Sequence, residues 1–133
     1  MVATCVFLFV LNLSVNAEDD DAGIQIMIEA QLAAFRSDDA PRAFSFASDP
    51  IRDIFGMPEN FIAMVRSQYP VVVAPASVVF LKIEHDNGAT LQPVQMSDDR
   101  GQLWLAVYSM QRDAQGSWRI NGCVLQRLQG DST

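Results

Sequence analysis

The hydrophobic pattern of the chain changes near Val71, and this change constrains the fold more than any other feature of the sequence. Before Val71, apolar residues recur at spacings of three and four, the period of a helix that buries one face. After it, stretches rich in β-branched and aromatic residues are separated by short turns, which is typical of strands. A block of helices followed by a block of strands predicts an α+β domain with an antiparallel sheet.

The first block predicts three short N-terminal helices. Residues 24–35 carry apolar side chains at spacings of four, four and three, and the acidic run before them suits the positive end of a helix dipole. A second helical stretch over residues 41–55 restarts at Pro50, and a third covers residues 58–69. Asp39 can cap the second stretch, because its carboxylate can accept the free amide protons of the next turn. A proline in a first helical turn costs nothing, since its missing N–H has no partner there.

The second block predicts four strands joined by three short turns, as in an antiparallel meander. The strands are expected over residues 76–84, 90–97, 102–112 and 117–128. On the third strand both faces are apolar, because Leu103 and Val107 point one way while Trp104 and Tyr108 point the other. Such a strand is central and covered on both sides. We expect the helices to cover one face of the sheet and a second copy of the chain to cover the other.

The first 17 residues resemble a secretory signal peptide. They contain 13 apolar residues and no charge, and Val15-Asn16-Ala17 has the small-x-small pattern that signal peptidase cleaves. No Lys or Arg precedes the apolar run, so either the signal is unusual or the true start lies upstream; the competing interpretation is a buried N-terminal helix or strand. We expect a periplasmic or secreted protein that meets a membrane only through an uncleaved leader. The remaining divisions are an acidic linker over 18–23, a single domain over 24–128 and a tail over 129–133.

Charge and cysteine counts exclude several classes of protein. The chain has 9 Lys and Arg against 16 Asp and Glu, a net charge of -7, and without the four acids at 18–21 the count is 9 against 12, or -3. An acidic chain neutralises phosphates poorly, so we expect no nucleic-acid partner. One histidine and two cysteines are too few for a structural zinc site, which takes about four N or S ligands. We expect no metal and no cofactor. Cys5 would leave with the leader, so Cys123 could form no intramolecular disulfide.

The order of elements and one motif resemble known families. Gly116-Ser117-Trp118-Arg119-Ile120 is similar to the final hairpin of the nuclear-transport-factor-2-like superfamily, whose members are small α+β cones with a curved sheet wrapped around helices and a pocket. A closer resemblance is to a bacterial family, domain of unknown function 4864. The segments that carry it are 31–36, 39–48, 50–52, 55–56, 61–66, 69–70, 101–104 and 117–123. The resemblance implies three short helices in the concave face of a four-stranded curved antiparallel meander, and it implies no established activity.

Few residues have side chains suited to catalysis. A reactive thiol needs a cationic neighbour or a helix N-terminus, and the sequence places neither beside Cys123, so we interpret it as a buried, inert cysteine. His85 lies at a predicted hairpin tip between two acidic residues, where a solvated turn histidine is expected rather than a metal ligand or an acid–base group. A carboxylate paired with Tyr69 or Tyr108 could support isomerase chemistry of the kind that the cone resemblance implies. The base would have to come from the helices, since the predicted strand interiors contain no carboxylate.

The sequence favours a binding pocket over a catalytic centre. We expect an apolar cavity with a few polar groups. The candidate pocket residues are Arg52, Tyr69, Trp104, Tyr108, Trp118, Asn121 and Cys123. The predicted function is a binding or accessory module for a small apolar or carboxylated molecule or for another protein. The alternatives are a cofactor-free isomerase or dehydratase that uses a carboxylate and a tyrosine, and a purely structural role in which the aromatic residues fill the core.

Overall fold

The computed structural model describes residues 17–129. The predicted signal peptide, apart from Ala17, therefore lies outside the described residues, as do residues 130–133 of the predicted tail. Within the described residues, no helix is both long and apolar enough to cross a membrane.

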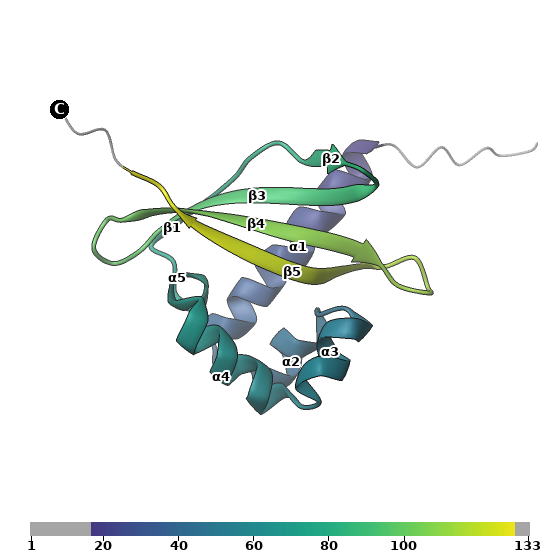
Figure 1. The fold of residues 1–133 in the computed structure, drawn as a ribbon, viewed down its shortest axis with the longest axis horizontal. Coiled ribbons are helices and arrows are strands. Elements are labelled where there is room, and N and C mark those ends of the chain that lie inside the picture. The colour runs from purple at the N-terminus through teal and green to yellow at the C-terminus, as the bar shows by residue number, and fades with distance from the viewer. Residues whose placement is uncertain (1–16, 130–133) are drawn as a thin grey trace, which may run out of the picture.

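The described part of the chain contains five helices, all in its first half (Figure 1). They are α1 (Ala17–Arg36), α2 (Ala40–Ser45), α3 (Asp49–Phe55), α4 (Pro58–Gln68) and α5 (Pro70–Val73). Two of the starts are capped by side chains, the first of them as the sequence predicts. Asp39 accepts a hydrogen bond from the backbone N–H of Arg42 at 3.1 Å, and Ser48 accepts one from that of Ile51 at 3.5 Å. Prolines occupy the first turns of α2 to α5, where they leave no hydrogen bond unmade.

Two features of the helical layer differ from the sequence prediction. The first helix begins at Ala17, so residues 18–23, predicted as a linker, form its first turns. The backbone of the acidic run thus belongs to α1. The short helix α5 was not predicted because its three consecutive valines are typical of strands. Val71 and Val72 are buried, so packing outweighs the local preference.

The described strands form one antiparallel sheet in the order β1-β3-β4-β5, with β2 also paired to β3. They are β1 (Ser77–Phe80), β2 (Glu84–Asp86), β3 (Ala89–Ser97), β4 (Leu103–Arg112) and β5 (Trp118–Arg127). The single strand predicted over 76–84 is divided because its partner contains Pro93, which has no N–H to give to the ladder. The side-chain amide of Gln92 instead donates to the carbonyl of Leu81 at 2.8 Å.

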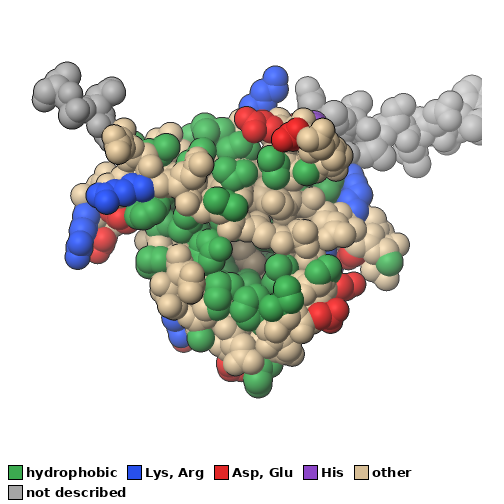
Figure 2. Space-filling view, viewed as in Figure 1, with side chains coloured by type: hydrophobic (Ala, Val, Ile, Leu, Met, Phe, Trp, Pro, Cys, Tyr) green, Lys and Arg blue, Asp and Glu red, His purple; other side chains and the backbone are tan. Residues whose placement is uncertain are grey.

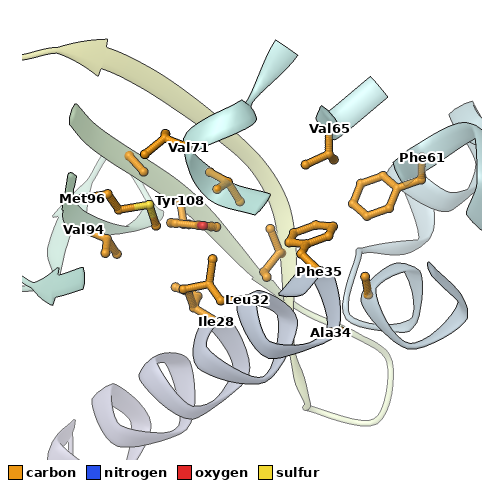
Figure 3. Packing of buried hydrophobic residues seen from close by; sticks show 14 of the residues in the cluster. Ile28, Leu32, Ala34, Phe35, Phe61, Val65, Val71, Val94, Met96 and Tyr108 are labelled. Carbon is orange, nitrogen blue, oxygen red and sulfur yellow. The ribbon is translucent and has the colours of Figure 1, made fainter. Parts of the chain in front are cut away.

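The helices pack against one face of the curved sheet, and α1 crosses the strands on that face (Figure 1). The predicted α+β class, with helices in the concave face of an antiparallel sheet, is confirmed, although the described chain has five helices and five strands in place of three and four. Figure 3 shows the core between these layers, where Tyr108 of β4 lies among Ile28 and Leu32 of α1 and Val71 of α5.

The opposite face of the sheet is not covered by any described helix and carries apolar side chains. Val79, Leu81 and Val124 expose 52%, 42% and 61% of their surface. In the sheet register, Pro93 is paired with Val107, and Val107 with Val124. An apolar row therefore crosses the outer face from β3 to β5.

Candidate functional site

A cavity of about 280 Å³ lies between the helices and the inner face of the sheet. Figure 2 shows it as a hollow ringed by hydrophobic side chains below the strands. Its lining is contributed by α1, α3, α4, α5, β4, β5 and the loop before α3, and consists of Gln31, Phe35, Ala47, Ile51, Ile54, Phe55, Phe61, Met64, Val65, Tyr69, Val72, Tyr108, Ile120, Gly122 and Cys123. Most of these side chains are apolar, so the cavity suits an apolar occupant.

The loop before α3 fixes one wall of the cavity to the sheet. The backbone N–H of Ser48 donates to the carbonyl of Ile120, and the N–H of Ile120 donates to that of Phe46, both at 2.9 Å. The Ser48 hydroxyl also donates to Oδ1 of Asn121 at 2.7 Å. These bonds hold α3 beside β5, so that Ile51 faces the cavity from a fixed position.

An aromatic cluster forms another part of the wall. The ring of Phe61 on α4 lies 6.0 Å from the ring of Phe35, 5.5 Å from that of Phe44 and 5.7 Å from that of Phe55. Tilted and edge-on ring pairs at these distances add attraction beyond the area that they bury. The cluster thus joins α1, α2, α3 and α4.

Four lining side chains can form hydrogen bonds, and one of them already has a partner within the protein. The amide nitrogen of Gln31 donates to the backbone carbonyl of Ala43 at 3.1 Å. Tyr69 follows the end of α4 and is half-buried. Tyr108 and Cys123 are directly opposite each other on β4 and β5. Two of the four polar side chains of the lining are therefore neighbours, at this pair.

The Tyr108 hydroxyl and the Cys123 thiol are both held in their protonated forms. Tyr108 exposes only 1% of its surface, and its hydroxyl has no hydrogen-bond partner among the described residues. Burial, with a smaller effect of the neighbouring Cys123, raises the pKa of Tyr108 well above its usual value of 10. Burial also raises the pKa of the Cys123 thiol to about 12. At neutral pH the thiol is therefore not a nucleophile, because only the thiolate reacts.

Three of the seven predicted pocket residues meet at this cavity, namely Tyr69, Tyr108 and Cys123. The other four do not line it. Asn121 is occupied by its bond to Ser48, and Arg52 forms an ion pair with Asp49 on α3.

The two tryptophans have structural contacts away from the cavity. The indole N–H of Trp104 donates to a carboxylate oxygen of Asp98 at 3.1 Å, which closes the turn between β3 and β4. The guanidinium of Arg112 lies 4.1 Å from the centre of the Trp118 ring, in a cation–π contact. Both residues thus stabilise hairpin ends.

Several lining residues were not among the sequence candidates. Ile51 and Phe55 on α3, and Phe61 and Val65 on α4, are each spaced by four and lie on one helix face. Their periodicity predicts burial, but a periodic pattern cannot show whether the buried face meets other side chains or a cavity.

The residues suited to acid–base or metal chemistry lie elsewhere. The described lining contains no Asp, Glu or His. His85 is exposed on β2, where its Nδ1 lies 3.4 Å from the hydroxyl of Thr90. Among the described residues, no group of three His, Cys, Asp or Glu side chains could hold a metal ion.

Comparison with known proteins identifies the family of the chain. The family profile described as domain of unknown function (DUF4864) matches residues 17–133, so the chain belongs to this family, as the sequence motifs predict. Among solved structures, the chain is similar to an NTF-2-like protein of unknown function from Burkholderia xenovorans LB400, with 16% identity and a TM-score of 0.49 over 85% of this chain and 88% of that one. A comparison with curated proteins gave no significant match.

Proposed function

We propose that this DUF4864 domain is a binding module that takes one small apolar molecule into the cavity between its helices and its sheet. The observation that carries the proposal is the apolar lining of a cavity of about 280 Å³ that opens to the surface (Figure 2). An engineered apolar cavity of about 150 Å³ holds one benzene molecule in another protein. By that scale, this cavity suits a molecule of about ten non-hydrogen atoms.

The chemistry of the lining supports binding over the isomerase or dehydratase alternative. Such an enzyme needs a base within hydrogen-bond reach of the proton that it removes. The described lining contributes two phenols and a thiol, of which the Tyr108 phenol and the Cys123 thiol have pKa values raised by burial, and it contributes no carboxylate or imidazole. These groups can donate hydrogen bonds but are poor bases at neutral pH.

The lining also favours a neutral ligand over a carboxylated one. The described lining residues include no Lys or Arg, and the guanidinium of Arg52 pairs with Asp49 instead. Burying a carboxylate without a cation is costly, because the charge loses its hydration and gains no partner. The sequence suggests an apolar or a carboxylated ligand, and we propose the apolar one.

Titration with tetralin, a bicyclic hydrocarbon of about ten non-hydrogen atoms, tests the proposal by calorimetry. We expect saturable binding of one molecule per chain. Met64→Trp should abolish it by filling the cavity, since Met64 is part of the lining. Met57→Trp is the matched control, because Met57 precedes α4, is 49% exposed and does not line the cavity. Absence of saturable binding to the unmodified protein, or equal binding to both variants, would contradict the proposal.

A further inference from the structure

Tyr108 lines the cavity, and its buried hydroxyl is an unsatisfied hydrogen-bond donor. Three buried polar side-chain atoms of the described residues have no partner, on Arg52, Tyr108 and Trp118, and of these residues only Tyr108 lines the cavity. Buried polar groups in native proteins nearly always have a partner. An unsatisfied group that borders a cavity is therefore a candidate contact for whatever occupies that cavity.

The neighbours of Tyr108 do not satisfy this donor. Across the sheet, Tyr108 is paired with Gln92 on β3 and Cys123 on β5. The amide nitrogen of Gln92 is occupied by the carbonyls of Leu81 and Pro93, each at 2.8 Å, and it is itself a donor. The thiol sulfur of Cys123 is a weak acceptor. The Tyr108 hydroxyl keeps its proton at neutral pH, because burial raises its pKa. It can therefore offer that proton to a ligand.

The polar content of the lining limits what else the ligand can carry. Gln31 is bound to Ala43, and no cationic side chain belongs to the described lining. A ligand with several buried polar atoms would leave most of them unpaired, at a cost in free energy. The Tyr108 oxygen exposes less than 1 Å², so contact requires a small shift of the lining.

We infer that the cavity selects neutral apolar molecules with one hydrogen-bond acceptor, such as a ketone, whose oxygen accepts the hydrogen bond of the Tyr108 hydroxyl. This inference rests on the proposed function, since it names the class of ligand that enters the same cavity. It also specifies the orientation of the ligand: the acceptor end lies against β4 and the hydrocarbon body lies against the helices.

A matched pair of ligands and a matched pair of variants test the inference. α-Tetralone and tetralin share the same bicyclic skeleton and differ by a carbonyl oxygen. Tyr108→Phe removes the buried hydroxyl of the lining, whereas Ser109→Ala removes a hydroxyl from the next position of β4, which does not line the cavity. We expect Tyr108→Phe to weaken α-tetralone binding about five- to tenfold, the value of one hydrogen bond, and to leave tetralin binding unchanged. Ser109→Ala should change neither affinity.

The infrared carbonyl band of bound α-tetralone gives a second measurement. A hydrogen bond to the carbonyl lowers the frequency of this band, so we expect a lower frequency in the unmodified protein than in Tyr108→Phe. If tetralin fails to bind the unmodified protein, the proposed function is wrong. If tetralin binds but Tyr108→Phe leaves both the α-tetralone affinity and the band unchanged, the proposed function stands and the inference is overturned. An equal loss of both ligands in Tyr108→Phe would also overturn it.

Discussion

At the scale of single residues, burial decides the chemistry of the cavity. Tyr108 and Cys123 are adjacent on the inner face of the sheet, and both have raised pKa values. A phenol and a thiol in water would begin to ionise between about pH 8 and pH 10. In the fold they remain neutral, so the cavity keeps an uncharged wall that suits an uncharged ligand.

The raised pKa of Cys123 makes stability depend on alkaline pH. The thiol of the unfolded chain ionises from its usual value near 9, while the folded thiol stays protonated up to about 12. Above the unfolded value the unfolded state therefore binds fewer protons, and the free energy of unfolding falls as pH rises, by up to about 1.4 kcal/mol per pH unit. Below that value the thiol is protonated in both states, so its contribution to the free energy of unfolding is fully present and does not change with pH.

Urea unfolding at a series of pH values measures this dependence. We expect the free energy of unfolding to fall less steeply between about pH 9 and pH 10 in Cys123→Ala than in the unmodified protein. In this range the raised pKa of Tyr108 has little effect on stability. Below about pH 8 the two proteins should differ by a constant amount. A decline of equal slope in both proteins would mean that the fold does not raise the pKa of the Cys123 thiol.

The sequence predicts part of the cavity at this scale, and the sheet explains the rest. Tyr69, Tyr108 and Cys123 could be predicted because tyrosine and cysteine combine an apolar body with a polar group. Asn121 could not be placed, because the register of β4 and β5 shifts at Ser109 and Met110, which interrupts the alternation of faces. Trp104 could not be placed either, since its contact with Asp98 depends on the geometry of a turn.

At the scale of elements, the segment before α3 connects the helical layer to the sheet. Ser48 caps α3 and donates a hydrogen bond to Asn121 on β5. It is only 3% exposed, and loss of its hydroxyl removes the partner of the Asn121 amide oxygen and of the Ile51 N–H. Because α3 supplies Ile51, Ile54 and Phe55 to the cavity, its position affects both stability and binding.

Ser48→Ala tests this link between an element and the cavity. We expect the free energy of unfolding to fall by about 1–2 kcal/mol, from the lost cap and the lost hydrogen bond. We also expect tetralin affinity to fall. Ser45→Ala is the control, because the Ser45 hydroxyl is exposed and donates only to the carbonyl of Arg42 in its own helix. Urea unfolding and calorimetry measure the two effects, and equal changes in both variants would contradict the role of Ser48.

Most element boundaries follow from local signals, and the exceptions have tertiary causes. The caps at Asp39 and Ser48 and the turn at Asn87 and Gly88, which have φ values of 48° and 81°, are visible in the sequence because particular side chains favour those conformations. The helix α5 and the division between β1 and β2 depend on packing and on a proline in the partner strand. Neither cause is local to the segment that it affects.

At the scale of the whole molecule, the two faces of the sheet have different roles in our account. The inner face holds the core and the cavity. The outer face carries the apolar row of Pro93, Val107 and Val124, with Leu81 beside it through a backbone hydrogen bond to Pro93 of 3.0 Å. We propose that a second copy of the chain covers this face, because its exposed apolar side chains, Val79, Leu81 and Val124, can pack against those of the copy about a two-fold axis.

Light scattering of the purified protein at high micromolar concentration tests the proposed dimer. We expect the mass of two chains, and the mass of one chain for Val124→Glu, since a buried unpaired carboxylate would oppose association. Ile26→Glu should remain dimeric, because Ile26 is as exposed as Val124, 64% against 61%, but lies on α1. A monomeric unmodified protein would contradict the proposal without affecting the cavity on the other face.

The most direct test of the central claim locates the bound ligand. Methyl groups of Ile, Leu, Val and Met can be followed by NMR during titration with tetralin, and they mark both faces of the sheet. We predict saturable shifts at Ile51, Met64 and Val72, which line the cavity, and unchanged signals at Val79, Leu81 and Val124 on the outer face. Shifts confined to the outer face, or shifts that never saturate, would contradict the claim that this domain binds a small apolar molecule in its cavity.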